Sequence, residues 1–532
     1  MRKALFLSFI WLISFCFNYY GQNVIQPDNK KSITIVLIID GLRPDAITPD
    51  VMPNLYQLQK DGVNFTNSHA VIPTVTRVNS ASLASGCYPG THGIMSNSIY
   101  IKEFNPSSSV STSNYKNLIS IDSLKNGNLL SVKSIGEILH QNNVKYAAIS
   151  SGSPGSAFLL NHHVMEGGGY LVSSEIDNGN NPAIPKEIGN EIINQFGKPP
   201  TKDKNLTYNT SVDWTENVLL NYVFPTLEPE VIYNWFTEPD HSQHKFGTGS
   251  KEYIGALKNN DKYIGLLITR LKELGLYENA NIIITSDHGM NTDVSAVNIE
   301  ETFNSGGINS DDFVIASSGE TVLLHVKDHD KSIIKKIVEL LQSKDWTGAI
   351  FTEASTDMKN KNDLFNPYGF IEDTFSLDLI HAYHPERKPD ILFNFRWTSD
   401  KNKYGVPGTS YTLTNGKAGE LKEKGGHGNI SPACINNTLI TWGKSFKSGV
   451  EIKNPAGIVD ITPTVLSLLG IKTNSGFDGR VLNEAFISGP DHQKITVDVE
   501  TISVESKDKK YNATIQISSV GKYWYVDKGW RK

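Results

Sequence analysis

Short runs of branched apolar residues alternate along this chain with longer segments in which apolar residues recur every three or four positions. The short runs lie at residues 32–39, 146–150, 231–235 and 281–285. Continuous runs of this length are typical of strands that are buried on both faces, as in a parallel sheet. The longer periodic segments lie at residues 52–61, 132–140 and 251–274. This alternation predicts an α/β fold in which helices flank a mostly parallel central sheet.

The pattern changes between residues 292 and 425. Strand-like runs at 321–327 and 349–353 enclose a helical segment at 333–341, and another strand-like run follows at 391–396. We therefore predict a smaller α+β cap at residues 292–425 that is inserted into a catalytic core. That core would comprise residues 22–291 and 426–532.

The residues after the predicted cap also show patterns that indicate secondary structure. The segment IVDITPTVLSLL at residues 458–469 predicts a helix, and residues 514–519 and 523–527 predict short strands. Residues 174–208 are polar enough to predict a loop insertion.

The first residues predict a secretory signal peptide at 1–21. Arg2 and Lys3 precede an apolar run at residues 4–17, and Gly21 follows shortly after. The alternative is a membrane anchor, but the run is shorter than the roughly 18 residues that a span needs. We expect an exported protein that is periplasmic, extracellular or surface-associated and has no stable membrane span.

Composition and charge narrow the function further. The chain has 532 residues, 39% of them hydrophobic, and a formal net charge of -6. This composition excludes a disordered chain, and the charge provides no basic surface for duplex nucleic acid. A pocket for a small anion remains compatible with it. The oligomeric state cannot be read from the sequence.

Only three cysteines are present, at positions 16, 87 and 434. Removal of a signal peptide would leave Cys87 and Cys434, too few for a disulfide scaffold. The two could form one bridge, but two separately buried thiols are the favoured interpretation.

Acidic residues follow three of the predicted strands. Asp40 ends the first strand, Asp240 comes shortly after the strand at 231–235, and Asp287 follows the strand at 281–285. A single Asp in such a position is usually a helix cap or a turn residue. In parallel sheets, however, ligands bind beyond the carboxyl ends of the strands, so three such residues together predict a site.

Histidines accompany these carboxylates. His244 lies four residues after Asp240, which is one helical turn, and His288 directly follows Asp287. His427 lies among glycines, where backbone can approach a ligand closely. Three Asp and three His form a mixed oxygen and nitrogen ligand set, which suits zinc best and could also take manganese or iron. The pairs His162–His163 and His381/His384 are better explained as solvated loop residues.

The order of these motifs resembles the alkaline phosphatase superfamily, and within it the type I phosphodiesterase/nucleotide pyrophosphatase family. The segment Pro-Thr-Val-Thr-Arg-Val-Asn at 73–79 resembles that family's nucleophile segment. The segment Gly-Cys-Tyr-Pro-Gly-Thr-His-Gly-Ile at 86–94 resembles the turn that follows it. Each motif is weak alone, but together they run in the family's order across residues 33–482. The resemblance implies an alkaline-phosphatase-like core and hydrolysis of small phosphate-ester substrates.

The resemblance also implies a role for each residue. One divalent ion, most naturally zinc, would be held by Asp240, His244 and His427. A second would be held by Asp40, Asp287, His288 and the hydroxyl of Thr76. Thr76 would be the nucleophile and would form a phosphothreonine intermediate, because a metal ion makes an alkoxide accessible near neutral pH. The segment 79–85 predicts a helix whose N-terminus would face the phosphate.

Two further residues are implied at the catalytic site. Asn97 matches the family's asparagine that binds a non-bridging phosphate oxygen, although a turn residue is the alternative. Arg77 departs from the family, which usually has an aromatic residue after the nucleophile that stacks on the base. A guanidinium can bind phosphate bidentately, or it can pair with a structural carboxylate.

The preferred hypothesis is therefore an exported two-metal phosphodiesterase or nucleotide pyrophosphatase. Arg77 favours a phosphomonoesterase as the alternative, and an inactive binding protein on the same scaffold is a third hypothesis. A sulfatase is disfavoured, because its Cys/Ser-x-Pro-x-Arg motif is absent around Thr76. The ligand pattern also differs from that of cofactor-independent phosphoglycerate mutase.

Overall fold

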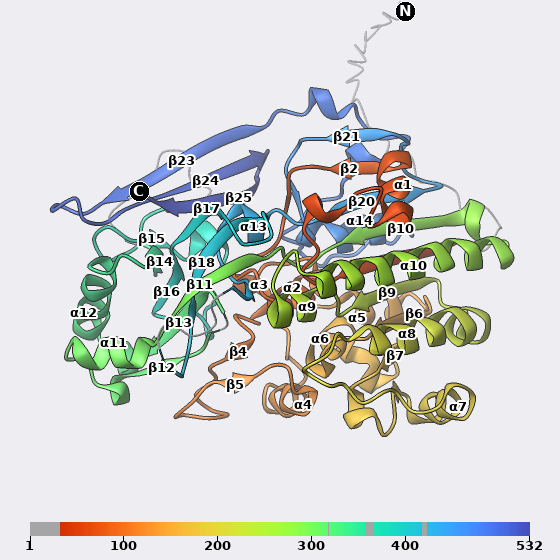
Figure 1. The fold of residues 1–532 in the computed structure, drawn as a ribbon, viewed down its shortest axis with the longest axis horizontal. Helices are drawn as coiled ribbons and strands as arrows, with labels where there is room; N and C mark the ends of the chain where they lie inside the picture. Colours follow the sequence, from red (N-terminus) through yellow and green to blue (C-terminus); the bar gives the residue numbers. More distant parts are fainter. Residues whose placement is uncertain (1–31, 318, 357–364, 418–422) are drawn as a thin grey trace, which may run out of the picture.

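A nine-stranded mixed sheet lies at the centre of the protein (Figure 1). The computed structural model describes residues 32–317, 319–356, 365–417 and 423–532, so the predicted signal peptide lies outside the described residues. The strand order is β21-β2-β20-β10-β1-β9-β6-β7-β8. The strands are β1 (Ile33–Ile39), β2 (Val63–Phe65), β6 (Tyr146–Ser150), β7 (Tyr170–Ser173), β8 (Ala183–Ile184), β9 (Val231–Phe236), β10 (Ala280–Thr285), β20 (Leu439–Gly443) and β21 (Val450–Ile452).

The five strands from β10 to β7 run parallel to one another, which confirms the predicted mostly parallel core. The β20 strand pairs antiparallel with β10, and β8 pairs antiparallel with β7. Every residue of β1, β6, β9 and β10 is buried. This burial explains why these four strands were readable from the sequence, because strands covered on both faces carry continuous apolar runs.

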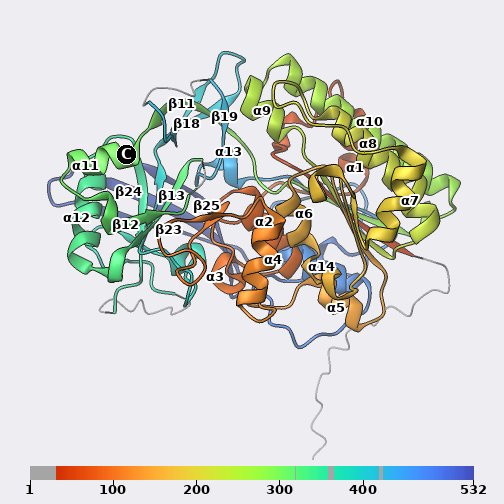
Figure 2. The same cartoon turned by 90° about the horizontal axis from the view of Figure 1, so that it is seen from below.

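Helices cover both faces of the sheet (Figure 2). Alternate residues of β1 point in opposite directions, so Ile35 and Leu37 face one layer while Val36 and Ile38 face the other. The first layer contains α1 (Pro53–Asp61), α8 (Asn209–Val218) and α10 (Lys251–Glu273). The second layer contains α2 (Thr76–Ser85), α5 (Ile135–Gln141), α6 (Pro154–Leu160) and α14 (Ile461–Leu468).

A five-stranded sheet, in the order β12-β13-β16-β14-β15, forms most of the region from 313 to 395. The β16 strand lies between β13 and β14 and is antiparallel to both. With α12, these strands form the predicted β-α-β unit. The elements are β12 (Phe313–Ile315), β13 (Thr321–Val326), α12 (Lys331–Gln342), β14 (Thr347–Thr352), β15 (Phe375–Ser376) and β16 (Ile391–Phe395).

A four-stranded sheet connects this region to the rest of the protein. Its order is β17-β18-β11-β19, and β11 pairs with both β18 and β19. The strands are β11 (Asn291–Val297), β17 (Trp397–Lys401), β18 (Pro407–Leu413) and β19 (Gly425–Gly426). Because β11 and β19 both cross the expected boundaries at 291/292 and 425/426, the division into core and cap stays a prediction.

The C-terminal segment forms a three-stranded antiparallel sheet of β23 (Asp498–Glu505), β24 (Asn512–Val520) and β25 (Tyr523–Arg531). The last two contain the strands predicted at 514–519 and 523–527. Asp527 Oδ1 on β25 lies 2.9 Å from His69 Nε2, and the hydroxyl of Tyr525 donates a hydrogen bond to Asp460. These polar contacts and the aromatic rings around them fix the sheet to the core.

The interpretation of residues 174–208 as a loop insertion was wrong. This segment contains β8 and the helix α7 (Lys186–Phe196), in which Ile192 is fully buried. The helix packs one face against the core, since Gly189 and Ile192 are buried and Ile188 and Phe196 are partly buried there, while its remaining positions are mostly polar. Its high proportion of polar residues therefore concealed an amphipathic helix.

The two described cysteines are separate, buried free thiols, which confirms the favoured interpretation of Cys87 and Cys434. Within the described ranges, no helix combines the length and apolar character needed to cross a bilayer.

Candidate metal centre

The predicted site residues come together because three neighbouring parallel strands end at the same edge of the sheet. Asp40 directly follows β1, and the β1–β10 register places Ile38 opposite Thr285, so Asp287 emerges beside it. On the other side, Ile39 lies opposite Phe236, and the chain then reaches Asp240. The backbone N–H of Asp240 donates to the carbonyl of Asp40 at 3.1 Å. The sheet topology thus accounts for the convergence of the three carboxylates.

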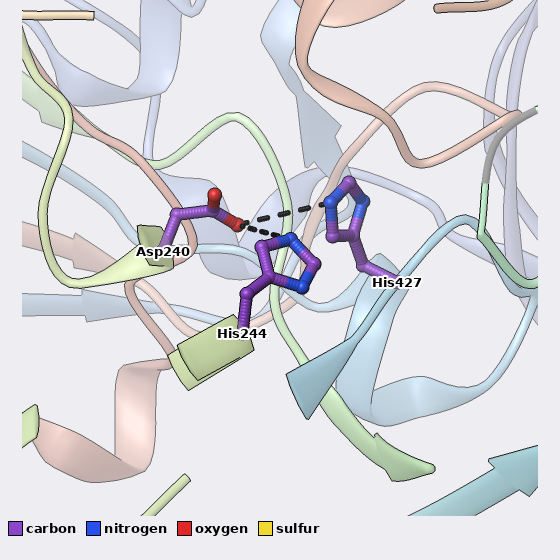
Figure 3. A group of neighbouring side chains, drawn as sticks. All are labelled: Asp240, His244 and His427. Carbon is purple, nitrogen blue, oxygen red and sulfur yellow. Dashed lines mark ion pairs between the residues drawn. The ribbon is translucent and has the colours of Figure 1, made fainter. Parts of the chain in front are cut away.

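Asp240, His244 and His427 form the first group (Figure 3). Asp240 Oδ1 lies 3.3 Å from His244 Nε2 and 3.7 Å from His427 Nε2. Asp240 and His244 both belong to α9 (Asp240–Phe246), so the predicted single helical turn is confirmed. The Nδ1 atoms of His244 and His427 lie 2.8 and 2.9 Å from the carbonyls of Gly425 and Thr74. These contacts orient both Nε2 atoms toward Asp240, as in metal-binding histidines.

His288 is at the centre of the second group. Its Nε2 lies 3.1 Å from Asp287 Oδ2, 3.6 Å from Asp40 Oδ1 and 3.4 Å from the hydroxyl of Thr76. Its Nδ1 lies 2.9 Å from the carbonyl of Gly289. Ligand atoms of Asp40, Asp240 and His288 also lie within 4.8 Å of one another, so Asp240 is shared between the two groups.

Each of the three carboxylates has one oxygen that makes no hydrogen bond and whose ion-pair neighbours are imidazole nitrogens. Asp40 Oδ1, Asp240 Oδ1 and Asp287 Oδ2 are buried and have no hydrogen bond, and no Lys or Arg in the described part of the chain forms an ion pair with them. Buried carboxylates with orphaned oxygens are costly unless cations approach them. Together with three imidazoles, this donor set fits divalent ions, and zinc in particular.

The pKa values express the same electrostatics. Burial raises the pKa of Asp40, and the neighbouring carboxyls of Asp287 and Asp240 raise it further. Burial also raises the pKa of Asp287. For Asp240, burial acts in the same direction, but His244 and His427 outweigh it and lower the pKa. Burial lowers the pKa of His427, which keeps this imidazole neutral, as a metal ligand must be.

Thr76 is the first residue of α2, three residues before the predicted helix start. The residue before the helix, Val75, makes no side-chain cap, and Asn97 accepts the N–H of Arg77, so Thr76 and Val78 are the first-turn residues whose N–H groups could bind an anion. Asn79 was missed as a positioning residue. Its Oδ1 accepts from Val71 N at 2.7 Å, and its Nδ2 donates to the carbonyls of Val71 at 3.2 Å and Val75 at 3.0 Å. These bonds fix the chain that leads to Thr76.

Asn97 and Arg77 lie together at the start of α2. Asn97 Oδ1 accepts the backbone N–H of Arg77 at 3.0 Å, which ties the amide to the helix N-terminus. Arg77 Nε is buried without a hydrogen bond, and no described carboxylate lies within ion-pair distance of this guanidinium. Burial lowers the Arg77 pKa to about 10, although Asp40, Asp240 and Asp287 act in the opposite direction. The alternative that Arg77 pairs with a structural carboxylate therefore has no support among the described residues.

The other predicted histidines have different surroundings. His381 stacks on Tyr88 and Trp524 with ring centroids 3.8 and 4.0 Å apart, and His384 is buried with Nε2 3.0 Å from Ser131. The interpretation of these two as solvated loop residues was wrong, because aromatic packing and hydrogen bonds enclose them. Neither they nor His162 and His163 belong to a potential metal-binding group among the described residues.

Sequence reasoning also missed residues that support the carboxylates. The indole N–H of Trp235 donates to Asp40 Oδ2 at 3.1 Å, and Gln243 donates to the carbonyl of Gly41 at 2.9 Å. Gly41 has φ +69°, and its N–H donates to Asp287 Oδ1 at 3.1 Å. The Asp-Gly pair at the end of the first strand was the available signal, since it predicts a positive φ.

The comparison with known families agrees with this arrangement. The family model for type I phosphodiesterase/nucleotide pyrophosphatase matches residues 34–393. The chain belongs to the type I phosphodiesterase/nucleotide pyrophosphatase family. The family predicted from the order of the motifs is thereby confirmed.

Individual relatives are distant. Venom phosphodiesterase 2 of Crotalus adamanteus is 28% identical over 264 residues, which are 49% of this chain and 27% of the relative. The chain therefore spans about a quarter of that protein's length. Human bis(5'-adenosyl)-triphosphatase ENPP4 is 25% identical over 460 residues, which are 84% of this chain and 81% of the relative.

A solved structure confirms the alkaline-phosphatase-like α/β fold. Murine ectonucleotide pyrophosphatase/phosphodiesterase 5, as an inactive variant in complex with AMP, is similar with a TM-score of 0.56 at 16% identity. The match covers 84% of this chain and 98% of the murine chain. At this identity the likeness extends to the fold alone.

Proposed function

We propose that this protein is an exported, metal-dependent hydrolase of small phosphate esters that acts as a phosphodiesterase or nucleotide pyrophosphatase. The observation that carries the proposal is the convergence of the Thr76 hydroxyl, three buried carboxylates and three imidazoles at one edge of the sheet. Several relatives bear the names of venom or ectonucleotide enzymes, which supports export.

Asp240, His244 and His427 would hold one divalent ion, and Asp40, Asp287, His288 and Thr76 would hold the other. Such ions, when bound, lower the pKa of a coordinated hydroxyl and offset the negative charge of the phosphoryl group. The orphaned oxygens of the three carboxylates support this assignment. Zinc is the proposed metal because the ligands combine imidazole nitrogen with carboxylate oxygen.

The chemistry would proceed through Thr76. Its Oγ1 attacks phosphorus, the bond to the leaving oxygen breaks, and a phosphothreonine forms. Water then attacks this intermediate, the bond between phosphorus and Oγ1 breaks, and the hydroxyl is restored. The N-terminus of α2, where Asn97 already accepts the N–H of Arg77, would lie toward the transferred group, and the Asn97 amide would bind a non-bridging oxygen. Because Asn97 Oδ1 accepts from Arg77 N, the amide nitrogen is the group that would donate to the substrate.

The nucleophile is tested with Thr76→Ala, and Thr76→Ser is the matched control that keeps a hydroxyl. We expect the Ala variant to lose turnover of a p-nitrophenyl phosphate ester while it retains its fold and nearly all of its bound zinc. The Ser variant should retain measurable turnover. Undiminished turnover in Thr76→Ala would refute the nucleophile assignment. A wild-type protein without bound metal would instead support an inactive scaffold.

Arg77 favours phosphomonoester hydrolysis as a second candidate function. Its buried Nε and the absence of an ion-paired carboxylate among described residues are consistent with a guanidinium that binds the substrate's anion. A monoester phosphoryl group carries one more negative charge than a diester. We therefore expect Arg77→Ala to lower kcat/KM for p-nitrophenyl phosphate more than for bis(p-nitrophenyl) phosphate. An equal effect on both substrates would remove the argument for the monoesterase.

A further inference from the structure

A short irregular segment, residues 202–208, lies against the helix α9, which carries two of the proposed zinc ligands. The segment forms neither helix nor strand, and most of its side chains are exposed. Its first and last residues, Lys202 and Tyr208, are instead partly buried. We call this segment the brace, because side chains at both of its ends connect α9 to the rest of the protein.

The helix α9 has only seven residues, so its position depends on tertiary contacts. Pro239 at its N-cap makes no side-chain hydrogen bond. Glu238 supplies one instead, because its Oε2 accepts the backbone N–H of Ser242 at 3.0 Å. The other oxygen, Oε1, accepts the backbone N–H of Tyr208 at 2.6 Å. One buried carboxylate therefore joins the brace to the start of α9.

Tyr208 and His241 form the centre of the contact between the brace and α9. Their rings are parallel to within 6°, and the ring centroids lie 3.5 Å apart. His241 Nε2 also donates to the carbonyl of Leu206 at 2.8 Å. His241 directly follows the proposed ligand Asp240, and His244 lies three residues later on the same helix. A movement of the Tyr208 ring would therefore be passed through His241 to both ligands.

Lys202 anchors the brace to the central sheet. Its Nζ donates to the carbonyl of Ser151, the residue after β6, at 2.7 Å, and it pairs with Glu175 Oε1 at 2.6 Å. The same ammonium group lies 4.4 Å from the centroid of the Tyr208 ring, which is a favourable cation–π distance. A continuous series of contacts thus runs from the edge of the sheet through Lys202 and Tyr208 to α9.

We propose that Tyr208 is a positioning residue for Asp240 and His244. Lys202 fixes the Tyr208 ring in this role. The brace and the carbonyl of Gly425, which contacts His244, then hold α9 from two separate segments of the chain. These contacts set the two ligands at the separation that a divalent ion requires. This inference rests on the proposed function, since it assigns the brace to the outer shell of the proposed metal centre.

Zinc binding by the full chain tests the proposal. Wild type and variants are stripped with a chelator, and zinc affinity is then measured by competition with a chromophoric chelator. Tyr208→Leu removes the ring stack and should weaken the binding of one of the two zinc ions by about 10- to 100-fold. Tyr208→Phe keeps the ring that stacks on His241, so its zinc affinity should stay within about threefold of wild type.

Tyr277→Leu is the matched control. Tyr277 also contacts an aromatic ring, Trp442, and a lysine, Lys272, but it precedes β10 and so lies at the opposite end of the parallel strands from the ligands. Its zinc affinity should equal that of wild type. A His427→Ala background identifies the ion concerned. Because the first group has already lost a ligand there, adding Tyr208→Leu should not weaken the remaining zinc further.

Circular dichroism separates a positioning effect from loss of the fold. If Tyr208→Leu does not fold, Lys202→Met tests the same series of contacts, and it should also weaken the binding of one zinc ion. Wild-type affinity in a folded Tyr208→Leu or Lys202→Met variant would overturn the inference. A Tyr208→Phe variant as weak as the Leu variant, or a further loss in the His427→Ala background, would also overturn it. Absence of zinc binding by wild type would instead refute the proposed function.

Discussion

The side chain of Asn79 offers a quantitative test of how the structure positions Thr76. The variant Asn79→Leu keeps a similar volume but removes three hydrogen bonds of 2.7–3.2 Å to the backbone of Val71 and Val75. At about 1 kcal/mol for each bond, the free energy of unfolding should fall by about 3 kcal/mol, because the N–H of Val71 is left without its partner. The matched control is Asn142→Leu, where a single 2.8 Å bond to Ile138 is lost from an exposed side chain. That variant should lose about 1 kcal/mol or less.

The assay combines urea denaturation with kinetics. The denaturation midpoint gives the stability difference, provided that the slope is unchanged. Turnover of a p-nitrophenyl phosphate ester should fall by about tenfold or more in Asn79→Leu, since small displacements of a nucleophile are costly. If Asn79→Leu were as stable as Asn142→Leu, the structural reasoning would fail. If its stability fell but turnover did not, Asn79 would contribute to the fold without positioning Thr76.

Three further predictions follow from the surroundings of the site. Gly41→Ala should lower the free energy of unfolding by about 1–2 kcal/mol and weaken zinc binding, because φ is +69° at Gly41 and the added Cβ would lie 3.2 Å from Asp240 Cα. Unchanged urea denaturation and unchanged zinc affinity would contradict this. Burial lowers the pKa of His244, but Asp240 outweighs burial and raises this pKa to about 9, so zinc binding should release a proton from His244. Zinc affinity should therefore rise by about tenfold per pH unit from pH 6 toward 9, and a flat profile in chelator competition would oppose it. Burial raises the pKa of Cys87 to about 12 and also raises the pKa of Cys434, so both thiols should react with a thiol reagent only after denaturation. Rapid labelling of the native protein would refute this prediction.

The central strands could be predicted from the sequence because the pattern that identifies each strand lies within the strand itself. The strands at β1, β6, β9 and β10 are buried on both faces and appear as uninterrupted apolar runs. The proposed ligands Asp40, Asp240 and Asp287 lie within a few residues of the ends of these strands, so sheet topology brings them together.

Other features depend on contacts between distant segments and left no local signal. The indole of Trp235 donates to Asp40, and this contact arises only when β9 pairs with β1. The helix α7 was concealed because its positions outside the packed face are mostly polar. The start of α2 was placed too late, since an Asn side chain that bonds to the preceding backbone has no recognisable sequence pattern.

The spread of the proposed ligands along the chain affects when a metal can be captured. Asp40 and His427 are separated by most of the polypeptide, so a growing chain offers only a partial first group until His427 has been synthesised. Tight binding would therefore follow folding. Once bound, an ion would stabilise the native state by about 4 kcal/mol at a thousandfold excess over its dissociation constant. Retention of both ions would then indicate that β1, α9 and β19 have all reached their native positions.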